Sequence, residues 1–292
     1  MKPDAFEGMA VYRPPLVYEL TGKRFTLAID DGFDYTLFFK DRKTLTFGRA
    51  GEEKDFAYDC LKIADRCYYV NFEFDMSARP RLAYTLVLDL ETSLVTMALS
   101  RLHVNPKIPR MPYVDFVFGA IVREDGTVPS VRHGYTSDLV RTAIDWNYGV
   151  FDIVHVYTTE RYYRVSFTPR GLARVRRGNP NLMSSSSSKP AEKPEEKPAE
   201  KPAAPDVYED HAMFVKIRDN IYLVNLLESQ LAIRSGHGNS LLVLMDLDEM
   251  HDVGRSFGTN GEGGEENYTF AAFGVRNDAS GVLAKKSGYY IR

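Results

Sequence analysis

The stretch LKIADRCYYVNF, residues 61–72, occurs a second time in the chain as VKIRDNIYLVNL at residues 215–226. Both copies keep Lys, Ile, Asp, Tyr, Val and Asn in the same columns, so that Lys62 corresponds to Lys216 and the later columns keep this spacing. Each copy consists of two runs of alternating large side chains joined by a polar turn, which is the pattern of a β-hairpin. A register that is kept across a turn indicates two related halves of the chain.

The similarity between the halves extends beyond this hairpin. VLDLE at 87–91 returns as LMDLD at 244–248, so that Asp89 corresponds to Asp246. A weaker alignment sets FTLAIDDGFDYTLFF at 25–39 against IVHVYTTERYYRVSF at 153–167. The segment ELTGKRFTLAI also has a counterpart in YTSDLVRTAIDW. We therefore predict two duplicated domains, residues 1–128 and residues 129–292.

Period-two alternation of aromatic and β-branched residues predicts that both domains are all-β. Runs such as KRFTLAI, CYYVNFEF, AYTLVLDL and NIYLVNLL are separated by short turn signals, and helical periodicity rarely exceeds a turn or two. Domains of this size with eight to ten strands are expected to close into antiparallel barrels, which have no exposed edges and can hold one small ligand inside. A pair of open sandwiches is the structural alternative.

One low-complexity segment interrupts the second domain. SSSSSKPAEKPEEKPAEKPAAPD, residues 184–206, combines proline and alternating charge with a lack of large apolar residues, so it cannot form a core. It lies between RYYRVSF and HAMFVKI, which both belong to the second copy. We predict a disordered insertion over residues 178–207, since a long loop adds little closure entropy.

The overall composition limits the classes of partner. A net charge of −3 and a pI near 6.1 provide no broad basic surface, so nucleic acid is not expected as a partner. No apolar run approaches the length of a membrane span or a signal peptide, so we expect no membrane association and a cytoplasmic location. The oligomeric state is left open, with a homodimer among the expected forms.

The cysteines and histidines do not form a metal-binding pattern. Cys60 and Cys67 stand opposite Phe214 and Ile221 in the hairpin alignment, which favours two core thiols over a disulfide or a metal pair. The six histidines lack the close spacings of metal motifs. We therefore expect neither a metal site nor a cofactor.

Several segments of the sequence resemble a known family. VHVYTTERYYRVSF, DHAMFVKIRDNIYLVNLLES and LLVLMDLDEMHDVGRSFG resemble the C-terminal domain of the MoaF family, and FAYDCLKIADRCYYVNF with TLVLDLETSLVT resembles its N-terminal domain. The resemblance implies two lipocalin-like barrels, and the family name implies an accessory role in molybdenum-cofactor biosynthesis. The sequence departs from the family pattern at Leu226-Leu227-Glu228, where the family has an aromatic residue, Arg and Glu; the acid is kept and the base is lost.

Columns that are apolar in one copy and ionisable in the other mark positions changed beyond the needs of the fold. In the weaker alignment His155 stands opposite Leu27 and Tyr157 opposite Ile29. Since residues two apart share a strand face, His155 and Tyr157 are expected to point in the same direction. The alternative for His155 is a hydrogen-bonded histidine with a structural role only.

Glu228 is the third such position, because the hairpin alignment sets it opposite Phe74. It shares a strand face with Tyr222, and both copies keep the character of that face, so we expect the face to point inward. Burial and mutual charge would move the pKa values of a histidine and a glutamate towards neutrality. We predict His155, Glu228 and Tyr157 as catalytic residues, with a solvent-exposed Glu228 at a strand end as the alternative.

Four further side chains are candidates for substrate binding. Arg164 stands opposite Thr36 in the weaker alignment, and its planar donors suit a carboxylate or phenolate, although the sequence favours an outward-facing charge among Arg161, Arg164 and Arg170. His133 lies in RHGYTSDLVR near the predicted mouth of the second domain, where turn and cap chemistry is the alternative. The predicted binding set is Arg164, Tyr222, Tyr162 and His133.

Together these features predict a cofactor-independent enzyme of small-molecule metabolism. It would act as an isomerase, cyclase, dehydratase or decarboxylase on a small hydrophobic or aromatic molecule inside the second barrel. The alternative is a non-catalytic binding or carrier protein, including an accessory to molybdenum-cofactor biosynthesis. A third reading is a scaffold that recruits partners through its insertion.

Overall fold

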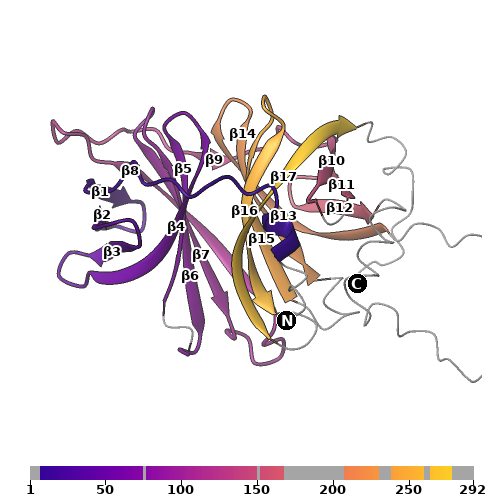
Figure 1. Ribbon diagram of the computed structural model, residues 1–292, viewed down its shortest axis with the longest axis horizontal. Helices are drawn as coiled ribbons and strands as arrows, with labels where there is room; N and C mark the ends of the chain where they lie inside the picture. Colours follow the sequence, from indigo (N-terminus) through magenta and orange to yellow (C-terminus); the bar gives the residue numbers. More distant parts are fainter. Residues whose placement is uncertain are drawn as a thin grey trace, which may run out of the picture.

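The computed structural model describes residues 7–74, 77–149, 152–167, 207–229, 238–259 and 264–277. In these ranges one short 3-10 helix, η1 (Glu7–Ala10), precedes a long series of antiparallel strands that form two bodies lying side by side (Figure 1). The described residues contain no helix with the length and apolar character needed to cross a membrane.

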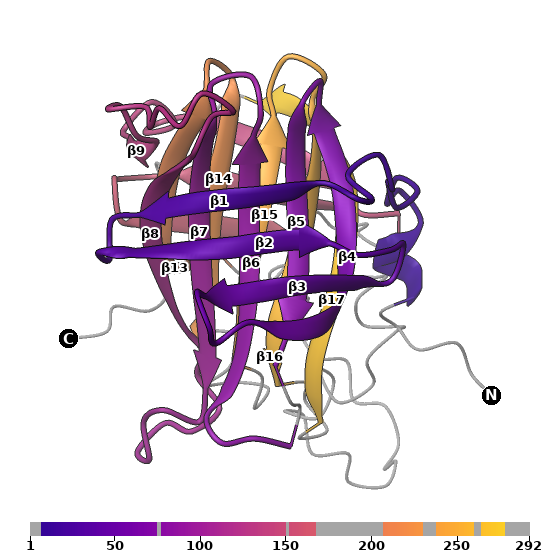
Figure 2. The ribbon, with the colours of Figure 1, turned by 90° about the vertical axis from the view of Figure 1, so that its left-hand side faces the viewer.

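The first body is a closed eight-stranded barrel. Its strands are hydrogen-bonded in sequence order, and β1 pairs with β8 to close the ring. Figure 2 shows β1, β2 and β3 crossing in front of the longer strands at a steep angle. The strands are β1 (Arg24–Ile29), β2 (Phe33–Phe39), β3 (Thr44–Arg49), β4 (Lys54–Ala64), β5 (Cys67–Glu73), β6 (Arg81–Asp89), β7 (Leu94–Leu102) and β8 (Tyr113–Ile121).

The second body repeats this arrangement with the next eight long strands. β10 pairs with β17, and β12 pairs with β13, so this sheet also closes into an eight-stranded barrel. The two-residue strand β9 (Gly134–Tyr135) adds to the outside of β13. The strands are β10 (Ala143–Asn147), β11 (Asp152–Tyr157), β12 (Tyr162–Phe167), β13 (Val207–Arg218), β14 (Ile221–Glu228), β15 (Gly238–Asp246), β16 (His251–Thr259) and β17 (Glu265–Asn277). The predicted all-β fold of two tandem antiparallel barrels is confirmed.

The strand registers show which residues of the two barrels are equivalent. Leu27 lies opposite Tyr35 and Ile121 in the first barrel, as Trp146 lies opposite Ile153 and Gly274 in the second. Hence β1 corresponds to β10, β2 to β11, and so on around the ring. Equivalent residues of β4 and β13 are as far apart in the sequence as the repeated hairpin predicted. Fewer residues separate the equivalent residues of β2 and β11.

The weaker sequence alignment is therefore wrong by one strand. It set β1 against β11, whereas β11 is the counterpart of β2. His155 corresponds to Leu37 and Tyr157 to Phe39, and Arg164 corresponds to Thr46 instead of Thr36. The physical reason is that every half-buried strand has the same period of two, so that neighbouring hairpins resemble one another. The lead-in similarity, which matched β1 with β10, joins equivalent strands.

The connection between β12 and β13 is longer than the equivalent connection between β3 and β4. The additional residues of the second half lie there. The connection between β3 and β4 is residues 50–53, whereas the one between β12 and β13 is residues 168–206. The predicted insertion at 178–207 falls in this connection, and all of it but Val207 lies outside the described residues. The predicted boundary between residues 128 and 129 falls in the connection between β8 and β9.

Each barrel has its own apolar core, and a third apolar cluster joins the two. β14 illustrates the arrangement, since Tyr222, Val224 and Leu226 point into the second barrel while Ile221 and Leu223 face the first. Central strands such as β5, β14 and β15 are thus buried on both faces. The residues of the joining cluster are Leu61, Ile63, Cys67, Tyr69, Val87, Ala98, Val215, Ile217, Ile221, Leu223, Leu242, Leu244, Val253 and Ala271.

Polar groups inside this interface are paired across it. The Tyr69 hydroxyl donates to the carbonyl of Leu242 at 2.7 Å. Arg255 is fully buried and donates to the Asn71 side chain and to the Ser100 hydroxyl. Burial lowers the pKa of Arg255 to about 10, which leaves the guanidinium charged near neutral pH.

The two cysteines occupy apolar sites, as the hairpin alignment predicted. Both are buried free thiols, Cys60 in the core of the first barrel and Cys67 in the joining cluster. Burial raises the pKa of each thiol to about 12, so neither is a reactive thiolate near neutral pH.

The segment before β1 ties the first barrel to the second. It crosses from one body to the other (Figure 1), and Met9 of η1 is buried in the core of the second barrel. Arg13 donates to the Thr269 hydroxyl at 2.6 Å, and the Tyr12 ring meets Phe273 edge-on at 5.3 Å. The N-terminal segment therefore contributes to the packing of the second half.

We predict that the two barrels unfold as one cooperative unit, because the joining cluster buries both faces of the central strands. Leu223→Ala should lower the free energy of unfolding by about 2–5 kcal/mol, as expected for a fully buried leucine. Denaturant titration followed both by the fluorescence of Trp146, the single tryptophan, and by circular dichroism measures this. Val128→Ala, at an exposed site, is the control. Two separate transitions in the wild type would contradict the prediction.

Candidate functional site

The two barrels have equivalent ends. In the first barrel one rim is formed by the connections that follow β1, β3, β5 and β7, and in the second barrel by those that follow β10, β12, β14 and β16. We call these ends the first mouth and the second mouth. The predicted catalytic residue Glu228 is the last residue of β14 and therefore lies at the second mouth, where it is half-buried.

Four carboxyl groups point into the second barrel, and three of them stand at positions that are apolar in the first. Asp210 corresponds to Phe56 and Glu228 to Phe74, with the same spacing as in the repeated hairpin. Alternation along the strands places both carboxyls on the inward face, in line with Phe214 on β13 and Leu226 on β14. Two further carboxyls also point inward: Asp252 of β16, on the same face as Gly254, and Glu266 of β17, on the same face as Phe270. Asp252 is the counterpart of Val95. We call Asp210, Glu228, Asp252 and Glu266 the acidic interior.

Glu228 has an altered affinity for protons. Burial raises its pKa to about 8, and the charges of Glu266 and Asp210 add to the effect. Glu228 is therefore mostly protonated near neutral pH, when an ordinary glutamate has lost its proton. A carboxyl group in this state can donate a proton to a bound molecule.

The other three carboxyls have polar partners inside the barrel. Glu266 accepts hydrogen bonds from the Asn239 amide and the Ser256 hydroxyl, both at 2.8 Å, and burial raises its pKa. Asp252 accepts from the backbone N–H of Ala272 at 2.7 Å, and burial raises its pKa well above the ordinary value. Asp210 accepts from the Ser229 hydroxyl at 2.5 Å.

His155 and Tyr157 lie in the same interior, on the inward face of β11. The His155 ring meets Tyr163 edge-on, with ring centroids 5.5 Å apart, and it is 6.4 Å from Tyr157. Burial lowers the pKa of His155 to about 3, so its imidazole is neutral and only weakly basic near pH 7. The Tyr157 hydroxyl contacts the Met245 sulfur at 3.4 Å, and burial raises its pKa.

The structure brings the three predicted catalytic residues into one barrel but disperses the predicted binding residues. Tyr222 points inward, where its hydroxyl donates to Asp138 at 3.2 Å, at the end of the barrel opposite the second mouth. Arg164 and Tyr162 lie on the outer face of β12, since Tyr163 and Val165 fill the inner one. Arg164 forms an ion pair with Glu209 at 2.6 Å, and the Tyr162 ring packs 4.6 Å from His211.

His133 lies away from both barrel interiors. Its Nδ1 is 2.8 Å from the Thr96 hydroxyl, and its Nε2 is 3.8 Å from the carboxylate of Asp89. Asp89 also pairs with Arg218 of the second half. Although burial raises the pKa of Asp89, the nearby His133 ring and hydrogen bonds from Arg218 and Thr92 hold it below the ordinary value. His133 therefore belongs to a polar contact between the two halves.

Sequence reasoning missed Asp210, Asp252, Glu266 and the inward ring of Tyr163. Asp210 and Asp252 could have been found from the sequence. The alignment of the repeated hairpin, extended along its first strand, sets Asp210 opposite Phe56. The alignment that sets Asp246 opposite Asp89, extended into the following strand, sets Asp252 opposite Val95. Tyr163 was missed because the incorrect alignment chose the opposite face of β12. Glu266 follows a glycine-rich stretch that gives no register signal.

The first mouth contains a pocket of about 510 Å³. Its wall consists of aromatic rings, and charged side chains stand at its edge. The volume lies in the range of small-molecule sites. The lining residues are Tyr35, Phe47, Gly48, Arg49, Glu52, Lys54, Phe56, Phe74 and Tyr84.

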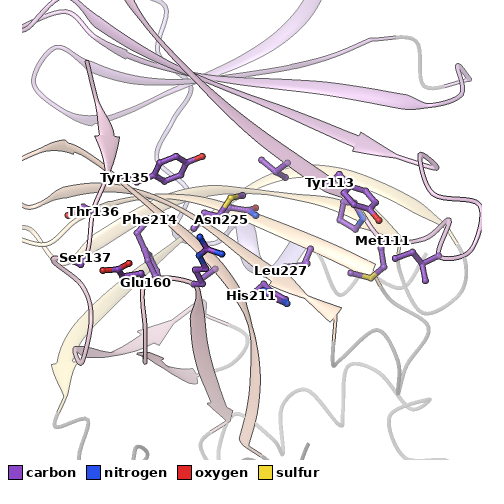
Figure 3. Close-up of a pocket in the computed structure, with 16 residues that line it drawn as sticks. Met111, Tyr113, Tyr135, Thr136, Ser137, Glu160, His211, Phe214, Asn225 and Leu227 are labelled. Carbon is purple, nitrogen blue, oxygen red and sulfur yellow. The ribbon is translucent and has the colours of Figure 1, made fainter. Parts of the chain in front are cut away.

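A groove of about 820 Å³ runs along the seam between the two barrels (Figure 3). Figure 3 shows Met111 and Tyr113 at one end and Tyr135 and Thr136 at the other. The outer surface of β13 and β14, including His211 and Leu227, lines the side that belongs to the second barrel. This groove is separate from the interior that holds His155, Tyr157 and Glu228.

Among the described residues, no group of three or more histidine, cysteine, aspartate or glutamate side chains is arranged to hold a metal ion. The acidic interior is dispersed along the barrel and bonded to hydroxyl and amide groups, and it does not form such a group.

Comparison with known proteins supports the resemblance for the first half of the chain. Residues 4–104 match the family model described as the MoaF N-terminal domain, which spans the first seven strands of the first barrel. No curated protein matches the chain. The MoaF match and the barrel fold fit a small-molecule binding or accessory role. The predicted C-terminal MoaF domain stays a prediction.

We predict that Glu228 makes the protein less stable as the pH rises. Its pKa is about 8 in the folded protein against an ordinary 4.5 once unfolded, so between these values the unfolded chain releases a proton that the folded protein keeps. The free energy of unfolding should therefore fall from about pH 4.5 to pH 8. Glu228→Gln should lose this component and exceed the wild type by about 2–4 kcal/mol at pH 8.

Denaturant titrations at several pH values measure this difference, and the comparison with Glu228→Gln isolates the component that depends on Glu228, including its interaction with Glu266. Glu124→Gln, at an exposed site, is the matched control. Parallel stability curves for the wild type and Glu228→Gln would contradict the assigned protonation state.

Proposed function

We propose that the second barrel binds a small apolar or aromatic molecule and catalyses a cofactor-independent acid–base reaction on it, with Glu228 as the proton donor. The observation that carries this proposal is the inward-facing pair Asp210 and Glu228, which stands where the first barrel has apolar side chains. The fold does not require carboxyls there, because the first barrel closes with Phe56 and Phe74 in the same columns.

Carboxyls inside a barrel disfavour folding, which supports a functional reason for their presence. Removing a carboxylate from water costs several kcal/mol unless the group is paired or neutralised. The acidic interior relieves this cost by holding protons, as the raised pKa values of Glu228, Asp252 and Glu266 indicate. A protein that keeps such groups despite their cost has a use for a protonated acid at this place.

The residues would have different roles. Glu228, with a pKa of about 8 and a position at the second mouth, would give its proton to a carbon or oxygen of the bound molecule. His155 stays neutral near pH 7, so it would orient the ligand by a hydrogen bond instead of removing a proton. Tyr157 would contribute its ring to the apolar surroundings of the ligand inside the second barrel. In isomerisation, dehydration and cyclisation the Glu228 carboxylate formed in this way would take up the proton that the substrate releases, and in decarboxylation it would be protonated again by water.

We predict that Glu228→Gln abolishes proton transfer while the fold is kept. The wild type, incubated in deuterium oxide with a panel of phenolic, polyketide-like and terpenoid molecules, should introduce deuterium into at least one of them, as measured by mass spectrometry. Glu228→Gln should reduce the rate by about 100-fold or more, since general acid catalysis contributes 10²–10⁴-fold. Tyr162→Phe, on the outer face, should retain the rate of the wild type. Binding of a compound without exchange or conversion would favour the carrier alternative.

The pH dependence of the reaction should follow Glu228. The rate should fall as the pH rises past about 8, because Glu228 then loses the proton that it has to donate. His155→Gln should weaken binding but keep this descending limb, because the imidazole does not titrate in this range. A limb that disappears in His155→Gln would assign the proton transfer to His155 instead.

A further inference from the structure

We infer that the first mouth is a second, independent ligand site, and that it takes a planar aromatic molecule carrying a carboxylate or a similar oxyanion. This site lies in the other barrel and does not depend on the function proposed for the second barrel. Three observations carry the inference: the geometry of the rings, the identity of the equivalent residues in the second barrel, and the charges at the rim.

The rings of the first mouth form a continuous aromatic wall. Tyr35 stacks almost parallel on Phe47, with centroids 5.3 Å apart and planes 15° apart. Phe74 meets Phe56 at 4.7 Å and Tyr84 at 5.4 Å, and Phe47 meets Tyr84 at 5.3 Å. Although these five rings pack against one another, they leave the pocket of about 510 Å³ open to solvent. A flat ring system can stack within such a wall.

The second barrel shows that the fold does not need these rings. The residues equivalent to the five rings are aliphatic or acidic, and none is aromatic, although the second barrel closes with the same strand order and register. The aromatic wall is therefore a property of the first mouth and not of barrel closure. In the order Tyr35, Phe47, Phe56, Phe74 and Tyr84, the equivalents are Ile153, Val165, Asp210, Glu228 and Leu241.

Arg49 stands at the rim and lines the pocket. Its Nε donates to the Tyr35 hydroxyl at 3.2 Å, and its guanidinium lies 3.5 Å from the centroid of the Phe33 ring. Its Nη2 forms an ion pair with the carboxylate of Asp31 at 3.7 Å, a distance longer than that of a hydrogen bond. Because a guanidinium has five N–H donors, Arg49 keeps donors for a bidentate contact with an oxyanion.

The remaining charges at the rim favour an anion as well. Lys54 lines the pocket and is exposed, and none of the ion pairs in the described part of the chain involves it. Glu52 supplies the single carboxylate of the lining, against the two cations Arg49 and Lys54. The Tyr84 ring completes the wall beside them. An aromatic oxyanion would stack on the rings and place its charge next to Arg49.

The test uses two fluorescent probes of nearly the same shape, one with a negatively charged group and one without it. Anilinonaphthalene sulfonate carries an anionic group, and phenylnaphthylamine is its uncharged analogue. The wild type should bind the sulfonate with one site per chain in the aromatic pocket, and more tightly than the neutral probe. Arg49→Gln should weaken binding of the sulfonate about tenfold, as expected for the loss of one charge-assisted contact, and leave the neutral probe unchanged.

Three further variants locate the site and control for folding. Phe74→Ala should weaken both probes, whereas Tyr135→Ser, in the groove between the barrels, and Glu228→Gln, in the second barrel, should affect neither. Thermal melting checks that each variant is folded, and Lys54→Gln serves as a second charge variant if Arg49→Gln is unstable. Equal binding of both probes, an effect of Tyr135→Ser, or no binding at all would overturn the inference.

Discussion

The packing of β4–β7 against β13–β16 is the constraint on which the rest of the molecule depends. Both faces of these strands are apolar, one for the barrel that they belong to and one for the partner barrel. Such strands would expose a large apolar surface in an isolated barrel, so each half needs the other. The N-terminal segment and the contact of Asp89 with Arg218 strengthen the same connection. Because the joining face lies along the sides of the barrels, it does not cover the first mouth.

This constraint explains which parts of the fold could be predicted from the sequence. The repeated hairpin contains the strands that meet at the joining face, and its columns are kept because a change on either face would disturb a core. The similarity of the outer strands β1–β3 and β10–β12 is weak, because none of them contributes a residue to the joining cluster. Their common period of two allowed a shift by one whole strand, which set His155 opposite Leu27 and Arg164 opposite Thr36.

The candidate site was predicted in part for the same reason. Glu228 was identified correctly as an inward-facing acid, because it belongs to the repeated hairpin. His155 and Tyr157 were assigned the wrong equivalent residues. They were still singled out, because both the incorrect alignment and the structural register set them opposite apolar residues of the first barrel. The pKa values could not be predicted, because they depend on how completely water is excluded. The depth of burial that makes His155 neutral and Glu228 a proton carrier is a property of the closed barrel.

The two halves illustrate how a duplicated container can take on two chemistries. The first mouth has aromatic rings with cations at its rim, and the second barrel has acids in the corresponding columns. The chemistry proposed for the second barrel requires that Glu228 holds a proton at neutral pH. Carbon-13 NMR of the protein with labelled glutamate carboxyls, titrated from pH 4 to pH 9, measures the pKa of this group. One carboxyl resonance should titrate near pH 8 and be missing from Glu228→Gln. If that resonance titrates near 4.5, the assigned protonation state is wrong.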